Sequence, residues 1–259
     1  MFDAVIIRST WDYHLHPIEF KRWLARLRAA EVPVWNSTAI IGWNMDKGYL
    51  EHLSLAGIAV VPTVRLTGAD TVTLRSVLKR HGWTRAVVKP SVSASAYDTW
   101  QTTAELAAFG DARVAMMLER SDVLVQPFIE EIDQGEWSLV FLGGEFSHAV
   151  IKRTAKDDFR VQRECGGSAE RAVPRRELIE FGQRVLACAP DATLYARVDV
   201  CLVNGAPMVM ELELIEPSLF LDLDAGAPKR FADAILARIA DVRCQKSDAS
   251  DCEPLRDSG

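Results

Sequence analysis

Two adjacent stretches near the C-terminus, 194-LYARVDVCLVNGAP-207 and 207-PMVMELELIEP-217, alternate apolar residues with charged ones. Apolar side chains occupy the even positions over 196–202 and 208–214. Within these ranges the charged residues occupy odd positions: Arg197, Asp199, Glu211 and Glu213. Because side chains of a strand alternate between the faces of a sheet, the pattern predicts a hairpin that buries its even face. The arginine and the carboxylates are then expected on one shared surface.

The loop of this hairpin follows from the same alternation. Opposed residues must have an even sum, which requires an odd number of loop residues. Asn204-Gly205 is typical of a two-residue type I′ turn, which would pair Asp199 with Met210 and divide the charges between the faces. The alternation therefore predicts a loop of about three residues, with Gly205 or a neighbour in the left-handed conformation.

A shared charged surface needs an explanation, because like charges across strands destabilise a pair. One arginine does not neutralise three carboxylates. The surface is either solvated, so that water screens the repulsion, or it binds a divalent cation. Mg²⁺ typically binds through one or two carboxylates plus substrate phosphates. We therefore predict a Mg²⁺ site at Asp199, Glu211 and Glu213, with Arg197 contacting phosphate as well as carboxylate.

Composition restricts the class of protein. The chain has 259 residues, 49% of them hydrophobic and 25% charged, which is typical of a globular protein with one large domain or two modest ones. The net charge of −6 disfavours nucleic acid as a partner. No apolar run reaches membrane-spanning length, so we expect no membrane partner. Five scattered cysteines without a CxxC pair indicate reduced thiols and a cytoplasmic location.

Periodicity along the chain predicts the order of elements. Strands are expected at 2–8, 32–35, 58–61, 86–90 and 123–129, and helices at 17–30, 70–81, 103–120, 174–188 and 228–242. Asn44 is expected to cap a helix that ends at Gly57. A second hairpin is predicted across Gly143-Gly144, and a disordered tail over 244–259. Alternating elements first and antiparallel strands later predict an α/β (α+β) fold with mixed sheets.

Two lysines end apolar segments, Lys47 in 44-NMDKGYL-50 and Lys89 in 86-AVVKP-90. The small, hydroxyl-rich stretch 91-SVSASAYDT-99 follows Lys89. It is either a loop that folds over phosphates or a flexible linker. The chain has no GxxxxGK[ST] and no GxGxxG, which excludes a P-loop protein and leaves a dinucleotide-binding fold without support.

Several short motifs, together and in this order, resemble those of the ATP-grasp superfamily in its glutathione-synthetase-like branch. The resemblance covers about residues 2–242, and its motifs are 45-MDK-47, 87-VVKP-90, 126-QPFI-129, 135-GEWS-138, 148-HAVIK-152, 158-DFRVQ-162, 196-ARVDV-200 and 211-ELELIEP-217. The first segment, 7-IRSTWDY-13 with 42-GWNMDKGYL-50, is most similar to the cycloserine-forming ATP-grasp cyclo-ligases and their relatives.

The resemblance implies an ATP-grasp fold of two α/β subdomains that clasp ATP. The small subdomain, or lid, would span 44–125, and the large subdomain with the metal site 126–243. Residues 1–43 would form an N-terminal subdomain that lacks on the order of 30 residues, one strand–helix–strand unit. Either the protein starts upstream, or the open sheet edge is exposed or covered by another subunit, which favours a homo-oligomer.

The resemblance also assigns roles to residues. ATP contacts fall to Lys47, Lys89, Gln126, Ile129, Glu136 and Lys152, where Gln126 and Ile129 offer backbone groups to adenine and Glu136 binds ribose. Lys152 and Arg197 would contact the transferred phosphoryl group. The metal ligands would be the same three carboxylates. Many relatives carry Asn where Glu213 stands, so its extra negative charge is expected to alter metal stoichiometry or affinity.

Substrate contacts remain open between two explanations. Arg153 and Arg160 would grip a substrate carboxylate or are solvated loop arginines. Asp12 and Tyr13 would line an amino-acid pocket. Trp11 beside them would do the same or pack against the helix at Trp23.

The implied function is an ATP-dependent carboxylate–amine ligase for a small amino-acid-like molecule. It would proceed through an acylphosphate and join nitrogen to carbon within one molecule or between two. The absence of a convincing Ser/His/Asp or Cys/His set agrees with chemistry that needs no nucleophilic side chain. The alternative is a regulatory or scaffold subunit that binds ATP without catalysis.

Overall fold

A computed structural model of the chain describes residues 4–154 and 166–250, with side chains as far as residue 242. Its strands are β1 (Val5–Ile6), β2 (Val34–Trp35), β3 (Val64–Leu66), β4 (Arg85–Pro90), β5 (Trp100–Thr103), β6 (Val123–Pro127), β7 (Glu136–Leu142), β8 (Glu145–Arg153), β9 (Ser168–Ala172), β10 (Tyr195–Val203) and β11 (Ala206–Glu213). Its helices are α1 (Pro17–Ala29), α2 (Thr38–Asn44), α3 (Tyr49–Leu55), α4 (Leu74–His81), α5 (Ala107–Leu118), α6 (Arg176–Leu186) and α7 (Ala227–Ser250), with short 3₁₀ turns η1 (Glu130–Gln134) and η3 (Leu221–Leu223). No helix in these ranges is long and apolar enough to cross a membrane.

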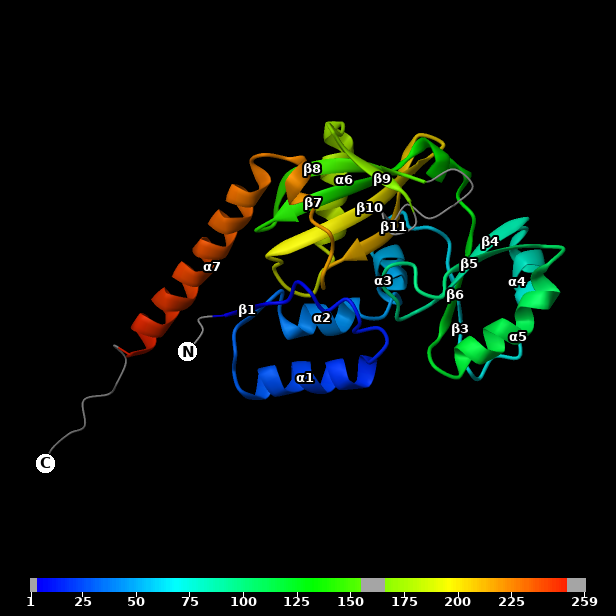
Figure 1. The fold of residues 1–259 in the computed structure, drawn as a ribbon, viewed down its shortest axis with the longest axis horizontal. Coiled ribbons are helices and arrows are strands. Elements are labelled where there is room, and N and C mark those ends of the chain that lie inside the picture. Colours follow the sequence, from blue (N-terminus) through cyan, green and yellow to red (C-terminus); the bar gives the residue numbers. More distant parts are fainter. Residues whose placement is uncertain (1–3, 155–165, 251–259) are drawn as a thin grey trace, which may run out of the picture.

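The strands form three sheets (Figure 1). β1 and β2 pair in parallel, the order β3-β6-β4-β5 makes a four-stranded sheet, and β11-β10-β7-β8-β9 makes a five-stranded one. The neighbours within both larger sheets are antiparallel. Helices α4 and α5 pack on the small sheet, and α6 packs on the large one. The α/β class is confirmed, and in the described ranges parallel pairing of whole strands is confined to β1 and β2.

Side chains of the central strand β10 alternate between the two faces of the large sheet, and both sets are buried. Ala196 and Val198 are fully buried in the core that α6 and α3 share with this sheet. Arg197 and Asp199 project from the opposite face, yet they are only 7% and 2% exposed. Arg197 and Asp199 are therefore not part of a freely solvated surface, and neighbouring side chains balance their charges.

The turn between β10 and β11 is shorter than the alternation predicts. Val203 pairs with Ala206, so the loop consists of Asn204 and Gly205, with φ angles of 51° and 79°. Positive φ at both central residues is the signature of the type I′ turn that Asn-Gly favours. The predicted three-residue loop is wrong, whereas the left-handed Gly205 is confirmed.

A β-bulge reconciles this turn with a shared charged face. Asp199 pairs with Glu211 but Val200 pairs with Val209, so Met210 is the extra residue of β11. Beyond the bulge the odd residue Val209 is fully buried, and Met210 faces the same side as the charges. The prediction that the apolar phase continues through Met210 is wrong, because an inserted residue shifts the phase without a change of turn.

The bulge is supported by the segment predicted as a strand at 58–61. The Val209 N–H donates to Ala59 O at 2.9 Å, and Val61 N–H donates to Val209 O at 3.0 Å. This contact appears as an isolated parallel bridge rather than a strand. The backbone polar groups of Val209, next to the bulge, are therefore satisfied by another segment.

Two buried asparagines hold the end of β11. Asn36 donates to Tyr195 O and Leu214 O at 2.9 and 2.8 Å and accepts from Leu194 N at 2.7 Å. Asn44 donates to Leu212 O and accepts from Leu214 N, both at 2.8 Å. Asn44 closes α2 instead of capping the next helix, and Ser37 caps α2, so the predicted cap is wrong.

Two further expectations meet the limits of the described ranges. Helix α7 extends to Ser250, within the range over which a disordered tail is predicted. Residues 251–259 lie outside the described ranges, as do residues 155–165 with the candidate Arg160.

We predict that Asn36→Ala lowers the free energy of unfolding by about 2–4 kcal/mol, because it removes its bonds and leaves buried backbone groups unpaired. Urea denaturation followed by circular dichroism measures the loss. The control is Ser54→Ala at an exposed position of α3, which should change stability by less than about 0.5 kcal/mol. Equal stability of the two variants would contradict the role of Asn36.

Candidate functional site

A cavity of about 960 Å³ lies where the N-terminal segment, the small sheet and the large sheet meet. Most of the residues that the sequence singles out line it: Tyr13, Lys47, Lys89, Gln126, Ile129, Glu136, Lys152, Arg197, Asp199, Glu211 and Glu213. They come from six of the strands and from several connecting segments. The fold therefore gathers residues that lie up to 200 positions apart in the sequence.

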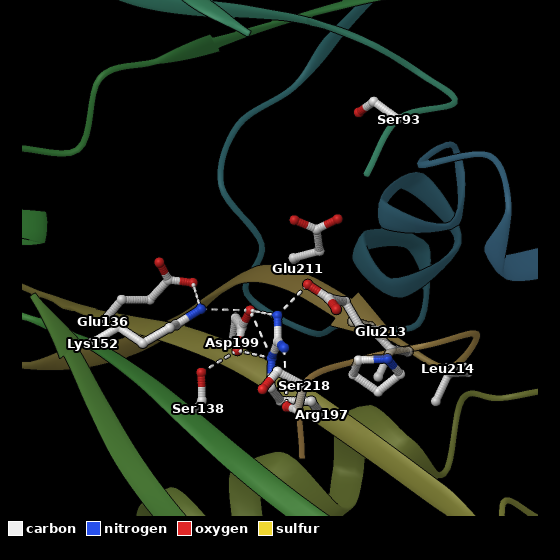
Figure 2. A network of polar contacts seen from close by, with 12 residues as sticks. Ser93, Glu136, Ser138, Lys152, Arg197, Asp199, Glu211, Glu213, Leu214 and Ser218 are labelled. Carbon is white, nitrogen blue, oxygen red and sulfur yellow. Dashed lines mark hydrogen bonds and ion pairs between the residues drawn. The ribbon is translucent and has the colours of Figure 1, made fainter. Parts of the chain in front are cut away.

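A chain of ion pairs occupies the floor of the cavity on the large sheet (Figure 2). Arg197 Nε and Nη2 each lie 3.0 Å from a carboxylate oxygen of Asp199. Lys152 Nζ donates to Asp199 Oδ2 at 2.9 Å and to Glu136 Oε1 at 3.2 Å. Ser138 Oγ donates to Asp199 Oδ1 at 2.5 Å. Every oxygen of Asp199 is thus engaged by at least one donor.

These contacts decide the charge states of the group. Burial alone would raise the pKa of Asp199, but the charges of Arg197 and Lys152 outweigh it and hold the pKa well below its ordinary value. Burial likewise lowers the pKa of Lys152, but the charges of Asp199 and Glu136 outweigh it and raise it. For Glu136 burial prevails over the attraction of Lys152, so its pKa is raised. The floor is an ionised aspartate held between two cations.

A second cationic group lies at the side of the small sheet. Lys47 Nζ contacts Glu211 Oε1 at 3.0 Å and donates to Ser93 O at 2.5 Å. Figure 2 shows that Glu211 extends away from the Arg197–Asp199 pair and towards Ser93. Lys89 lines the same cavity, and burial lowers its pKa despite the attraction of Glu211. The stretch 91–99 borders these lysines through Ser93, Ala94, Ser95, Ala96 and Thr99.

Glu213 and Glu211 are the carboxylates that face open space. Each is 28% exposed, Glu213 is paired with Arg197, and Glu211 is paired with Lys47. Burial raises the pKa of Glu213 to about 7, because the attraction of Arg197 does not offset it and Glu211 adds repulsion. Both carboxylates are hard oxygen donors of the kind that Mg²⁺ prefers.

The fit of this donor set to Mg²⁺ is uneven. In the described ranges, no three His, Cys, Asp or Glu side chains lie close enough together to hold a metal ion. Mg²⁺ commonly takes one or two protein carboxylates and completes its shell with phosphate oxygens, so Glu211 and Glu213 fit it. Asp199 would join them only by exchanging a contact with Lys152 or Arg197.

An apolar wall closes the end of the cavity beside β6 and η1. Gln126 is buried, and its Nε2 donates to Thr63 Oγ1 at 2.8 Å, so the side chain is used for structure. Phe128, Ile129 and Met210 line this wall. Cys201 is fully buried in the same cluster, where it packs as a small residue.

Two candidate substrate residues lie outside the cavity lining. Arg153 is exposed and contacts Glu170 at 3.3 Å and Gln134 O at 3.2 Å. Asp12 is exposed, whereas its neighbour Tyr13 is buried and lines the cavity. The structure therefore brings Lys152 rather than Arg153 to the site, and Trp11 and Tyr13 rather than Asp12.

Sequence reasoning assigned no role to two charged residues of the cavity, Arg8 and Glu216. Both belong to motifs quoted for the family resemblance, but neither stands in a charge pattern, so no local signal marked them. The pKa of Glu216 is raised to about 8, chiefly because burial disfavours its charged form. The repulsion from Glu213 adds to this, and it is larger than the attraction of either Arg197 or Arg8.

The raised pKa of Glu216 predicts how stability depends on pH. Since the folded protein holds this proton up to about pH 8 and the unfolded chain releases it near its ordinary pKa, folding loses stability as pH rises between these values. Glu216→Gln, which stays neutral, should match the wild type at pH 5 and exceed its Tm at pH 8.5 by about 2 °C or more. Differential scanning calorimetry measures both values. Glu145→Gln, at an exposed position of β8, should show no such divergence.

Comparisons with known proteins agree with this geometry. A family model described as the N-terminal domain of D-cycloserine synthetase DcsG matches residues 1–36. The cycloserine biosynthesis protein DcsG of Streptomyces lavendulae is 32% identical over 254 residues, which cover 92% of this chain and 84% of that protein.

Solved structures show the same fold. The crystal structure of D-cycloserine synthetase DcsG superposes with a TM-score of 0.83 at 28% identity, covering 92% of this chain and 84% of the other. A D-alanine–D-alanine ligase from Bacillus anthracis complexed with ATP gives a TM-score of 0.65 at 22% identity, covering 86% and 75%. The ATP-grasp fold expected from the motifs is confirmed. With this likeness spanning nearly its whole length, the chain belongs to the DcsG family of ATP-grasp carbon–nitrogen ligases.

Proposed function

We propose that this protein uses ATP and Mg²⁺ to activate the carboxylate of a small amino-acid-like molecule as an acylphosphate. An amine or hydroxylamine-type nitrogen then displaces the phosphate and forms an amide-type bond. The observation that carries the proposal is the gathering of four cationic side chains and two open carboxylates on one cavity: Lys47, Lys89, Lys152, Arg197, Glu211 and Glu213.

The proposed reaction has two steps. A carboxylate oxygen of the substrate attacks the γ-phosphorus of ATP, and the bond from that phosphorus to the β,γ-bridging oxygen breaks to release ADP. The nitrogen nucleophile then attacks the acyl carbon, inorganic phosphate leaves, and the nitrogen loses a proton. No side chain becomes covalently bound in either step, so the protein acts by positioning and charge neutralisation.

The cavity residues supply that neutralisation. Lys152 and Arg197 already balance Asp199 in the floor, so their charges are held in place before a substrate arrives. Such preorganised cations stabilise charge that spreads over the transferred phosphoryl group without a cost of reorganisation. Lys47 and Lys89, at the side of the small sheet, would contact the other phosphates.

Glu211 and Glu213 would hold the metal ion, and Asp199 would join them if one of its cationic partners turned to phosphate. When bound, Mg²⁺ would neutralise negative charge on the phosphates. The stretch 91–99 and the apolar wall beside β6 would exclude water, which matters because an acylphosphate hydrolyses readily. We further propose that the backbone at Gln126–Ile129 accommodates adenine and that Glu136 binds ribose by exchanging its contact with Lys152.

The relatives suggest the class of substrate. One is named for the synthesis of D-cycloserine and another for joining two molecules of D-alanine. Both names indicate small amino-acid-derived molecules. The first name points to a cyclic product and the second to the joining of two molecules. We infer a substrate of this class for the present protein, with either outcome for the new bond.

The alternative is a binding subunit without catalysis, and one assay separates the two. Purified protein is incubated with ATP, Mg²⁺ and a panel of amino acids and ureido-amino acids, and ADP release is measured. Release that depends on one substrate would support the ligase. Tight ATP binding without turnover across the panel would support the binding subunit instead.

Replacing a metal-site carboxylate tests the assignment more directly. We predict that Glu211→Gln lowers ADP release at least about 100-fold, because it removes a charge that both the metal and Lys47 require. The fold should be retained, with an unchanged circular dichroism spectrum, because this side chain is partly exposed to the cavity.

Glu145→Gln, an exposed glutamate on β8, serves as the matched control and should keep wild-type turnover. If Glu211→Gln retained full activity, the assignment of the metal ligands would be wrong even if the protein proved to be a ligase.

A further inference from the structure

Arg8 and Glu216 bring a guanidinium group and a carboxyl group to one part of the cavity. Arg8 follows β1 and Glu216 follows β11, so they are 208 positions apart in the chain. In the described ranges the two do not form an ion pair with each other, although each feels the charge of the other. The proposed nucleotide chemistry uses neither of them.

A single buried tyrosine places these residues. The hydroxyl of Tyr195 lies 2.6 Å from Ile7 O and 2.8 Å from Ile215 O, the carbonyls immediately before Arg8 and Glu216. The guanidinium of Arg8 stands over the Tyr195 ring, 4.9 Å from its centroid. Arg8 Nη2 also donates to Pro217 O at 2.6 Å. The pair is therefore held at a set separation before any ligand binds.

Each of the two groups lacks a partner for its main polar atom. Arg8 Nη1 is buried and has no hydrogen-bond partner within the described ranges. Glu216 lines the cavity and receives no hydrogen bond or ion pair from those ranges either. A buried polar group without a partner destabilises the protein, so such groups in a cavity mark a place where a ligand supplies the missing contacts.

The charges around the pair indicate which group of a ligand each residue would contact. Arg8 is close enough to Arg197 for their charges to repel, and burial together with this repulsion opposes its charge. A carboxylate between the two guanidinium groups would relieve the repulsion and would lie next to the cations of the cavity floor. On the other side, an ammonium group would favour the ionised form of Glu216 and pair with it.

We propose that Arg8 and Glu216 bind the carboxylate and the ammonium group of an α-amino acid substrate, an inference that rests on the proposed ligase function. In such a zwitterion both charged groups are attached to the α-carbon, so they can reach an arginine and a glutamate that line the same part of the cavity. A simple carboxylic acid would leave Glu216 unpaired, and a simple amine would leave Arg8 Nη1 unpaired. The pair therefore selects free amino acids over molecules that carry only one of the charges.

The test uses the full chain with saturating Mg²⁺ and the non-hydrolysable ATP analogue AMPPNP. The twenty L-amino acids and their D-enantiomers are screened by thermal shift, and the affinity of the strongest binder is measured by calorimetry. Its analogues without the ammonium and without the carboxylate are titrated beside it; for D-alanine these are propionate and ethylamine. We expect the amino acid to bind at least about 10-fold more tightly than either analogue.

Substitutions then separate the two contacts. Glu216→Gln should weaken the amino acid at least about 10-fold but leave the analogue without the ammonium unchanged. Arg8→Met should weaken the amino acid to a similar degree but leave the analogue without the carboxylate unchanged, and Arg8→Lys should restore part of the affinity. Both positions should keep AMPPNP affinity within about threefold. Arg22→Met in α1 and Glu145→Gln in β8 are exposed matched controls and should bind like the wild type.

Three results would overturn the inference: no amino acid binds to protein that binds AMPPNP, both variants bind the amino acid as tightly as the wild type, or each variant weakens the amino acid and both analogues equally. Failure of the wild type to bind AMPPNP would instead refute the proposed ligase function. Because nucleotide binding is measured in the same samples, the two failures are distinguishable.

Discussion

An ionised carboxylate is unstable inside a protein unless cations and hydrogen-bond donors compensate it, and the large sheet is built around one such carboxylate, Asp199. Its partners come from three neighbouring strands: Ser138 on β7 lies directly opposite it, Lys152 is on β8, and Arg197 is two residues away on β10. A shift of one residue in the register of any of these strands would direct one partner into the apolar core on the other face. The charge cluster therefore specifies the register of the sheet.

The same cluster prepares the site. Because Asp199 fixes Lys152 and Arg197 from beneath, their charges face the cavity in set positions and need not be collected from mobile surface side chains. A buried pair contributes little net stability, since desolvation offsets much of the attraction. Its value here is positional: a cation that is already desolvated and oriented stabilises transferred phosphoryl charge more than one that must first give up its water.

The end of β11 shows how packing serves the same purpose. The bulge at Met210 lets Val209 enter the core while Glu211 and Glu213 stay on the side of the cavity. Asn36 and Asn44 then hydrogen-bond the backbone beyond the bulge. Glu211 and Glu213 therefore belong to a segment whose backbone polar groups are satisfied by buried side-chain amides. The Tyr195 hydroxyl adds a contact to Ile7 O in the N-terminal segment and another to Ile215 O in the segment after β11.

The sequence by itself determined the main helices, the odd-position charges and the lysines that close apolar segments, because alternation and periodicity are local properties of the chain. It also determined the two-residue Asn-Gly turn, whose strong local preference prevailed over the parity argument. Only the tertiary structure decided that Arg197 and Asp199 are buried and that Asn44 binds β11 instead of capping a helix. It also decided that Arg8 and Glu216 line the same cavity. These outcomes depend on contacts between segments some 160 to 210 residues apart, and no pattern within a single segment encodes which distant surface will cover it.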